Sequence, residues 1–359
     1  MYMMLADQRI LLVGGAGFIG HHLALACRAY GGAVMVADNL MVNNLVANAY
    51  GENGERHRLY QNFLADRFEM MRAANVTLRN ADARILADLN LIFQEFKPTK
   101  VVHLAAISSA VEARKNPGLA FDLQLVTLRN TLELARLHEV GQVVLMSSST
   151  VYGDFETATV DESMRPRPRG IYASTKYMAE RLVRTYNQQH GLGTTIIRPS
   201  ALYGERCISR RVSQVFIENA LTGKPLLLEG GGDGRLDFTS IGDLVEGICR
   251  ALALPAEPGT SQTFNLTFGN ARTIAELAAI VKSVIPNAIL EDRPRADKPI
   301  RGTLSTQRAE EVLKWKAKHP IEVGYRAYVE WYVEQWARAQ ASVQNGTLRQ
   351  HTRVAIPAQ

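Results

Sequence analysis

Tyr172 and Lys176 are the two residues of this sequence whose types and spacing best fit acid–base chemistry. They lie four positions apart in a stretch of helical periodicity, 172–190, so the phenol and the ammonium share one helix face. The ordinary pKa of tyrosine, near ~10, is too high for a base at neutral pH, but a neighbouring positive charge stabilises the phenolate. Because many surface helices carry Tyr and Lys at this spacing, the assignment depends on what surrounds the pair.

A serine-rich turn precedes this helix. The expected strand 142–146 runs into Ser147-Ser148-Ser149-Thr150-Val151-Tyr152-Gly153. The turn lies at the carboxyl end of the strand, where open α/β sheets bind their ligands. Taken alone, the segment is equally typical of an ordinary Ser/Thr-rich turn.

A glycine-rich segment near the N-terminus predicts a phosphate-binding turn between a strand and a helix. The apolar run 10–13 leads into Gly14-Gly15-Ala16-Gly17-Phe18-Ile19-Gly20. Glycines at 14 and 17 let the backbone turn tightly and approach a pyrophosphate, and glycine at 20 permits close packing of helix on strand. The helix N-terminus adds free N–H groups and the positive end of its dipole. The glycines alone would also fit a flexible loop.

An acidic residue after the second strand strengthens the interpretation as a dinucleotide site. Asp38 follows the expected strand 33–37 and lies 18 residues beyond Gly20, close to the offset of a carboxylate that accepts hydrogen bonds from the adenosine ribose. Such a carboxylate would repel a 2′-phosphate, so we expect NAD and not NADP. Asn39, the next residue, does not alter this expectation.

Alternating strands and helices predict how these segments are positioned. From Arg9 to about Asn265, short β-branched runs alternate with helical patterns, which indicates α/β architecture with a doubly wound parallel sheet of the Rossmann type. The long connection 39–75 is expected to be an insertion with its own helix at 61–74. We expect strands at 10–13, 33–37, 76–79, 101–104, 142–146, 194–198 and 263–266, and helices at 18–30, 84–96, 117–138, 172–190, 210–222, 241–253, 273–284 and 322–338.

The pattern becomes less regular after Gly204, where a smaller α/β lobe for the substrate is expected. The predicted organisation is an NAD-binding domain over 1–204 that also takes in about 238–268, a substrate-binding lobe over 205–237 and 269–338, and a flexible tail over 339–359.

Composition excludes several classes of protein. Of 359 residues, 47% are hydrophobic and 21% charged, which excludes disordered, collagen-like and disulfide-scaffold proteins. Three scattered cysteines are too few for a disulfide framework or a zinc site, so we expect no metal and a cytoplasmic location. The longest run of apolar residues and glycine, 10–20, is shorter than the ~18 residues of a membrane span, so no membrane partner is expected. The net charge of +6 comes from dispersed basic residues, which favours an anionic small molecule over a nucleic acid.

Several motifs occur in order and at matching separations, and together they carry a family resemblance. Over about residues 9–335 the chain resembles the extended short-chain dehydrogenase/reductase family, specifically its NAD-dependent sugar-nucleotide epimerases and dehydratases of the UDP-glucose 4-epimerase type. The motifs are the glycine turn, Asp38, His103-Leu104-Ala105-Ala106, the serine-rich turn, Tyr172 to Lys176, and Arg198-Pro199-Ser200-Ala201-Leu202-Tyr203-Gly204.

The resemblance implies roles for individual residues. Tyr172 would be the catalytic acid/base, Lys176 would bind the nicotinamide ribose and lower the tyrosine pKa, and Ser148 would hydrogen-bond the reacting sugar oxygen. Besides Tyr172 and Lys176, the implied cofactor-binding residues are Gly14, Gly17, Phe18, Ile19, Gly20, Asp38, Asn39, Asp82, Leu104, Ala105 and Ala106.

For the substrate, a nucleoside-diphosphate sugar, the resemblance implies Ser149, Arg235 and Arg295, with the arginines as clamps on the diphosphate. The group Arg206, Arg210 and Arg211 is open to two interpretations, namely contact with a phosphate or uronate carboxylate, or a surface role.

Two positions depart from the family's 4,6-dehydratases, which carry an Asp-Glu pair just after the catalytic Ser/Thr. Ser149 and Thr150 occupy those places, so elimination of water lacks its acid and base. The decarboxylase branch usually has Glu at the Thr150 place, and the 3,5-epimerase branch has Cys. We therefore expect a homodimeric 4-epimerase of a nucleoside-diphosphate hexose or hexuronate that acts through a transient 4-keto sugar with bound NAD. Another 4-keto-forming reaction of the family (by a dehydrogenase, a reductase or an unusual dehydratase) and a non-catalytic NAD-binding role are the alternatives.

Overall fold

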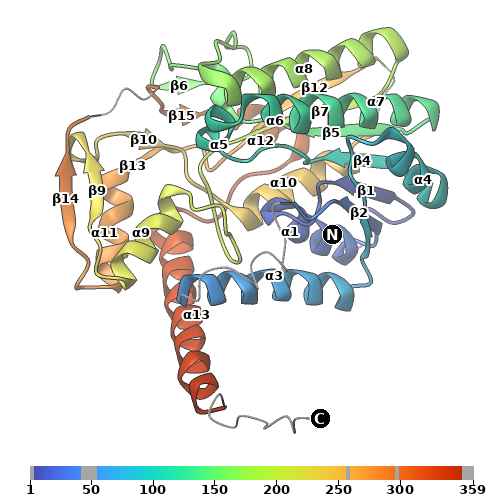
Figure 1. Ribbon diagram of the computed structural model, residues 1–359. Coiled ribbons are helices and arrows are strands. Elements are labelled where there is room, and N and C mark those ends of the chain that lie inside the picture. Colours follow the sequence, from blue (N-terminus) through green and yellow to red (C-terminus); the bar gives the residue numbers. More distant parts are fainter. Residues whose placement is uncertain (1–3, 42–54, 256–258, 296–298, 350–359) are drawn as a thin grey trace, which may run out of the picture.

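A seven-stranded parallel sheet forms the centre of the computed structural model (Figure 1). The structure describes residues 4–41, 55–255, 259–295 and 299–349. The strand order is β12-β7-β5-β4-β1-β2-β3, and the paired strands run parallel. The strands are β1 (Arg9–Val13), β2 (Ala33–Asp38), β3 (Thr77–Asn80), β4 (Lys100–His103), β5 (Gln142–Met146), β7 (Thr194–Pro199) and β12 (Ser261–Leu266). Each predicted strand is found within two residues of its expected ends, which confirms the doubly wound α/β fold.

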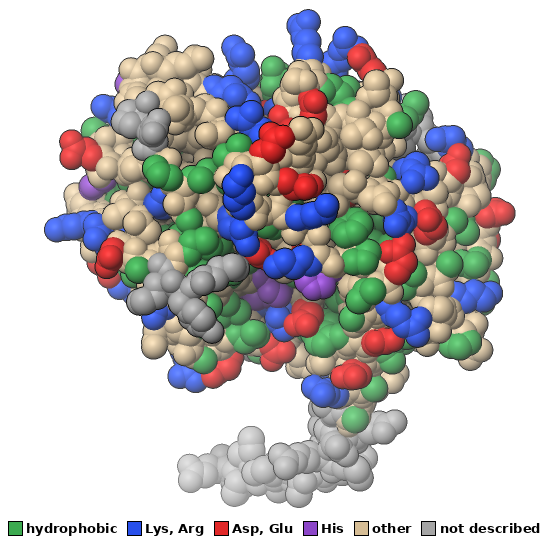
Figure 2. Space-filling view, turned by 180° about the vertical axis from the view of Figure 1, so that it is seen from behind, with side chains coloured by type: hydrophobic (Ala, Val, Ile, Leu, Met, Phe, Trp, Pro, Cys, Tyr) green, Lys and Arg blue, Asp and Glu red, His purple; other side chains and the backbone are tan. Residues whose placement is uncertain are grey.

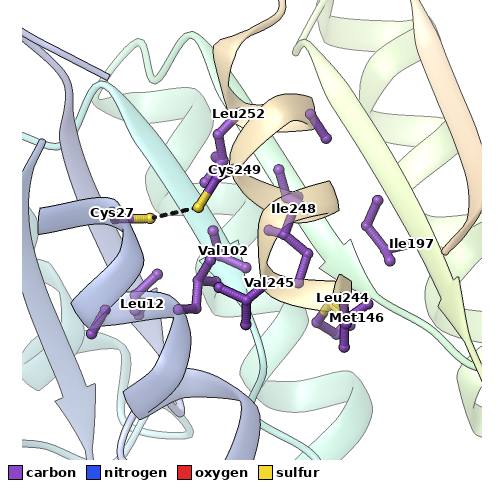
Figure 3. Close-up of a cluster of buried hydrophobic side chains, with 14 of the residues drawn as sticks. Leu12, Cys27, Val102, Met146, Ile197, Leu244, Val245, Ile248, Cys249 and Leu252 are labelled. Atoms are coloured by element: carbon purple, nitrogen blue, oxygen red, sulfur yellow. Dashed lines mark hydrogen bonds between the residues drawn. The ribbon is translucent and has the colours of Figure 1, made fainter. Parts of the chain in front are cut away.

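Helices cover both faces of the sheet because both faces of its strands are apolar. Successive residues of a strand point to opposite faces, so Leu12 and Val102 pack toward α1 (Phe18–Ala29) and α10 (Ile241–Ala253). Leu11 and Val101 pack toward α4 (Leu86–Phe96), α7 (Thr127–Leu137) and α8 (Gly170–His190) on the other face. Figure 3 shows the first of these layers, in which Cys27 of α1 and Cys249 of α10 face each other with their Sγ atoms 3.8 Å apart.

The predicted helix 117–138 is interrupted in the structure by a wider turn. It consists of α6 (Pro117–Phe121), a π-helical turn (Asp122–Val126) and α7, and it follows a short helix, α5 (Ala110–Lys115), that the sequence did not predict. This π-helical turn lies beside the cavity described below: Leu123 of the turn and Thr127, the residue after it, both line that cavity, as does Leu104, directly after β4.

The smaller lobe has its own core around two tyrosines of the last helix, Tyr325 and Tyr332. It consists of α9 (Val212–Leu221), β9 (Leu226–Glu229), α11 (Ile274–Val284), β14 (Leu290–Arg293) and α13 (Ile321–Arg349), with β9 pairing parallel to β14. Short strand pairs connect this lobe to the sheet: β8 (Leu202–Tyr203) with β11 (Thr239–Ser240), β10 (Arg235–Leu236) with β13 (Arg272–Thr273), and β6 (Thr159–Val160) with β15 (Thr303–Leu304). Helix α12 (Gln307–Leu313) returns to the sheet layer.

Two helices extend beyond their predicted ends. The helix of the 39–75 insertion, α3 (Glu55–Ala73), begins six residues earlier than expected and packs against α1 and α13. Residues 42–54 of the insertion lie outside the described residues. Helix α13 continues to Arg349, past the expected end at 338, and Ala339 is buried in the lobe core. The predicted flexible tail is therefore helical as far as 349, and 350–359 lie outside the described residues.

The surface mixes the two signs of charge. Figure 2 shows Lys and Arg side chains interspersed with Asp and Glu over the face that it presents. Within the described part of the chain, no helix is both long enough and apolar enough to span a membrane.

Candidate functional site

A cavity of about 700 Å3 runs along the carboxyl ends of β1, β2 and β4, beside the point where the strand order reverses. Ligands of open α/β sheets bind at this place. The structure puts eleven predicted cofactor positions around it: Gly14, Gly17, Phe18, Ile19, Gly20, Asp38, Asn39, Asp82, Leu104, Ala105 and Ala106. A second hollow, of about 970 Å3, lies at the opposite edge of the sheet around Arg9 and Lys100, and none of the predicted site residues is among the described residues that line it.

Close approaches of backbone to backbone require glycine at two positions of the turn. Gly14 has φ +78°, and a Cβ there would lie 2.5 Å from the backbone nitrogen of Ala105. A Cβ on Gly20 would lie 2.2 Å from the carbonyl oxygen of Gly15, so this glycine lets α1 approach the turn. Helix α1 begins directly after Gly17, which directs its free N–H groups at the cavity.

The two acidic cofactor positions differ in their surroundings. Asp38 accepts hydrogen bonds from the backbone N–H groups of Ala16 (2.9 Å) and Leu40 (2.8 Å), and its burial raises its pKa. Asp82 pairs with Arg84 and accepts a hydrogen bond from Asn39 (3.1 Å). These contacts, above all the hydrogen bonds from the Arg84 side chain, lower the pKa of Asp82 to about 2.

Helix α8 carries Tyr172 in its first turn and Lys176 in its second. Tyr172 is half-buried and packs with Ile107 and Ala113, in the segment whose residues Ser108 and Glu112 line the cavity. Lys176 is buried, and its Nζ donates to the carbonyl oxygen of Met146 (2.8 Å) at the end of β5. Burial, and then the positive charge of Arg211, lower the pKa of Lys176 to about 7.

Ser148 lies two residues beyond Met146 and caps the 3-10 helix Ser149–Tyr152. Its Oγ accepts hydrogen bonds from the backbone N–H (3.2 Å) and the hydroxyl (3.0 Å) of Thr150. Helix α8 packs against this 3-10 helix. The three predicted catalytic residues therefore lie on two elements that are in contact with each other, and the Lys176–Met146 hydrogen bond joins α8 to the end of β5. None of the three is among the described residues that line the cavity.

A buried ion pair fixes α8 behind the catalytic residues, and the sequence analysis missed it. Glu180 accepts hydrogen bonds from the Nε (2.9 Å) and an Nη (2.6 Å) of Arg198, with 0% and 2% of the two side chains exposed. Glu180 also accepts a hydrogen bond from the hydroxyl of Ser147 (2.6 Å). The guanidinium of Arg198 lies over the ring of Tyr152, 4.7 Å from its centroid. This network positions Lys176, one helical turn before Glu180.

Basic residues of the segment after β8 complete the wall of the cavity. Arg210 and Arg211 both line it, but they differ in partners. Arg210 pairs with Glu218 (3.2 Å), whereas the buried Nε of Arg211 has no hydrogen-bond partner among the described residues. A buried guanidinium nitrogen without a partner, close to a buried ammonium, favours an anionic ligand. Together with the glycine turn that lines the cavity, this fits a dinucleotide, whose pyrophosphate would lie against the turn.

None of the three predicted substrate positions, Ser149, Arg235 and Arg295, is among the described residues that line this cavity. Ser149 is buried in the 3-10 helix, and its carbonyl oxygen accepts a hydrogen bond from Arg301 (3.3 Å). Arg235 is exposed and donates to the carbonyl oxygen of Ala271 (2.6 Å). Arg295 forms an exposed ion pair with Asp233 (3.0 Å).

Two cavity-lining residues come from the insertion helix and were not predicted. Tyr60 and Arg67 of α3 reach the cavity from the side of the smaller lobe. The available sequence signal was the spacing of Phe63, Leu64, Arg67 and Met71, which places an arginine within an apolar helical stripe.

Comparison with known proteins shows the family to which the chain is similar. The model of the NAD dependent epimerase/dehydratase family matches residues 10–267. A putative UDP-glucose 4-epimerase of Methanocaldococcus jannaschii is 28% identical over 328 residues, which cover 90% of this chain and 97% of that protein. UDP-glucuronic acid decarboxylase 2 of Arabidopsis thaliana is 31% identical over 326 residues, which cover 88% of this chain and 66% of that protein.

A solved structure with the same fold contains the cofactor. The crystal structure of the UDP-glucose 4-epimerase of Thermus thermophilus, in complex with NAD, superimposes with a TM-score of 0.73 at 28% identity. The match covers 90% of this chain and 98% of the other.

Proposed function

The chain belongs to the NAD-dependent epimerase/dehydratase family and uses NAD, and from this premise we propose that it is a sugar-nucleotide 4-epimerase. Its substrate would be a nucleoside-diphosphate hexose or hexuronate, inverted at C4 through a transient 4-keto sugar. When bound, NAD supplies a hydride acceptor that can return the hydride to the sugar. The residues of the chain would bind the sugar, move one proton and keep the cofactor in place.

Tyr172 is the proposed acid/base, because it lies in the first turn of α8 and packs with Ile107 and Ala113, next to Ser108 and Glu112 of the cavity wall. As phenolate it would take the proton of the C4 hydroxyl and give it back after the sugar has turned over. The buried Lys176 would stabilise the phenolate electrostatically and donate to the nicotinamide ribose. Ser148 would hydrogen-bond the reacting oxygen, with the hydroxyl of Thr150 holding its side chain in place.

The observation that carries the choice of 4-epimerisation is that hydroxyl side chains, and no carboxylates, follow Ser148 in the serine-rich turn. The two positions after Ser148 hold the hydroxyls of Ser149 and Thr150. Of the carboxylates that line the cavity, Asp38 and Asp82 are the ones proposed to face the adenosine of NAD. Glu112 is exposed and paired with Lys115 (3.2 Å). A group to remove the C5 proton or to assist loss of water is therefore not assigned.

Product analysis tests this proposal. The protein is incubated with UDP-, GDP- and CDP-linked hexoses and with UDP-hexuronate, and products are identified by mass spectrometry and NMR. We expect a product of unchanged mass that is inverted at C4, with deuterium at C4 and at C5 both retained. A mass lower by that of water would indicate a dehydratase, and a mass lower by that of carbon dioxide a decarboxylase. Loss of the C5 label at constant mass would indicate epimerisation beside the 4-keto group.

We also propose that the enzyme is a cytoplasmic homodimer. Phe121 and Met178 lie on α6 and α8, which pack together, and they expose 38% and 44% of their surface. Exposed apolar side chains on adjacent helices favour association with a second copy. Light scattering should give twice the chain mass of 39.7 kDa.

The cysteines support the proposed cytoplasmic location. All three are free thiols, as a reducing compartment would keep them.

A further inference from the structure

Arg67 occupies a core position of the insertion helix α3. With Phe63, Leu64 and Met71 it forms the buried stripe of this helix, and none of its surface is exposed. Burial lowers the pKa of Arg67 to about 10, so the side chain is still charged at neutral pH. A guanidinium at an apolar position is costly, which indicates that it has a task that an aliphatic side chain would not perform.

The guanidinium of Arg67 joins two segments that border the cofactor cavity. Its Nε (3.2 Å) and one Nη donate to the carbonyl oxygen of Arg206, in the segment after β8. Its other Nη donates to the carbonyl oxygen of Ala16 (3.5 Å), in the glycine turn between Gly14 and Gly17. The planar fork of arginine can reach both oxygens at once, which the single ammonium of lysine cannot do in the same way.

The charges around Arg67 also relate it to the cofactor. The nearby carboxylate is Asp38, whose pKa the positive charge of Arg67 lowers, against the stronger effect of burial. His21 and His22 face the same cluster, and burial lowers the pKa of both, that of His22 to about 4, so both are neutral at pH 7. Arg206 donates to His21 (3.3 Å) and pairs with Glu205 (2.8 Å). Arg67 is thus a buried cation next to Asp38 and to the turn that would face the pyrophosphate.

The position of α3 is fixed at its lobe end. The hydroxyl of Tyr60 donates to the buried Glu218, which also accepts a hydrogen bond from Tyr332 (2.8 Å). Phe63 stacks on Trp331 with ring centroids 5.1 Å apart. These contacts fix α3 against the smaller lobe and so fix the position of Arg67 relative to the glycine turn.

We propose that Arg67 is a positioning residue for NAD, which ties the glycine turn to the segment after β8 and supplies a fixed positive charge beside Asp38. Its role is to keep the cofactor bound between the two half-reactions, when loss of NAD would leave a 4-keto sugar behind. The inference rests on NAD as the cofactor and not on the stereochemistry of the product. A different product would overturn the proposed 4-epimerisation and leave this proposal standing.

The test compares Arg67→Lys and Arg67→Met with Arg72→Met. Arg72 lies on the same helix, but it is exposed and pairs with Glu69, so its variant controls for loss of a positive charge on α3. Two quantities are measured on the full-length protein: the NAD retained after purification and dialysis, released by denaturation, and the Kd of NAD for nucleotide-free protein by calorimetry. Urea denaturation of each variant reports its stability separately.

We expect the Kd of NAD to rise at least about tenfold in Arg67→Met and by about threefold in Arg67→Lys, with less NAD retained in both, and to stay at the wild-type value in Arg72→Met. If Arg67→Met does not fold, Arg67→Lys decides the question, because it keeps the charge and one hydrogen bond. Wild-type Kd values in the folded Arg67 variants, even with lowered urea midpoints, would show that Arg67 only stabilises the fold and would overturn the proposal.

Discussion

Replacing Gly14 with alanine would test whether the glycine turn must approach the segment after β4 as closely as it does. The φ of +78° at Gly14 costs an L-residue about 1–2 kcal/mol. The added Cβ would lie 2.5 Å from the nitrogen and 2.6 Å from the Cα of Ala105, which are backbone atoms. Relief requires a shift of the chain itself, and overpacking of this kind costs about 1–3 kcal/mol more. We therefore expect the free energy of unfolding to fall by about 2–5 kcal/mol.

Gly223→Ala is the matched control for this substitution. Gly223 also has a positive φ, +67°, but a Cβ there would meet no atom within 4 Å. This variant should therefore lose only the conformational part, about 1–2 kcal/mol. Urea denaturation at constant pH, followed by circular dichroism, measures both losses.

The same two variants separate stability from cofactor binding. A displaced turn in Gly14→Ala would no longer present its N–H groups to the pyrophosphate, so we expect the Kd of NAD to rise at least about tenfold, or about 1.4 kcal/mol. Gly223→Ala should bind NAD as the wild type does, because Gly223 is not among the described residues that line the cavity. Equal stability losses in the two variants, with wild-type NAD affinity in Gly14→Ala, would refute the reasoning.

Three further predictions concern the residues of α8. Tyr172→Phe should lower kcat at least about 100-fold, with the calorimetric Kd of NAD unchanged, because it removes only the acid/base; near-normal turnover would exclude that role. Because the pKa of Lys176 is lowered to about 7 in the folded protein and stays near ~10.4 when unfolded, its charge destabilises the fold most below pH 7 and progressively less as pH rises. The free energy of unfolding, from urea titrations, should therefore exceed that of the wild type in Lys176→Met by an amount that decreases between about pH 6 and about pH 9. An increase of this difference with pH would contradict the assigned pKa. Glu180→Gln leaves the guanidinium of Arg198 buried without its carboxylate and should cost about 3–5 kcal/mol of unfolding free energy, whereas Glu69→Gln, in an exposed pair, should leave the urea midpoint unchanged.

The features that could be predicted from the sequence are those that depend on residues close together in the chain. The central strands of the sheet contain short apolar runs, such as Val143 to Leu145, whose side chains are completely buried. The glycine turn and Asp38 follow two of these runs directly, so the topology of a parallel sheet brings them together once the strands are placed. This explains why the predicted cofactor positions lie around one cavity.

The parts that could not be predicted depend on contacts between distant residues. In the sequence, Glu180 resembles an ordinary helical partner of Lys176, whereas its hydrogen-bond partner is Arg198 on the next strand. The helical spacing places Arg67 in an apolar stripe, but the carbonyl oxygens of Ala16 and Arg206 that bind its guanidinium come from distant segments. Helix α13 continues past its expected end, and Ala339, the first residue beyond that end, packs into the lobe core. The sequence after 338 has no clear apolar periodicity that would predict this contact.

The route of the chain between β7 and β12 has a consequence for biosynthesis and for the design of fragments. β7 pairs with β12, and α10 covers the layer that contains Cys27, but both partners are synthesised only after the first part of the lobe. A nascent chain that ends near Gly204 would present an unpaired strand edge and an uncovered apolar face, both of which promote aggregation. Expression of the N-terminal half alone should therefore yield insoluble protein. A tag or a circular permutation placed at the exposed turn around Gly223 would leave the sheet and α10 intact.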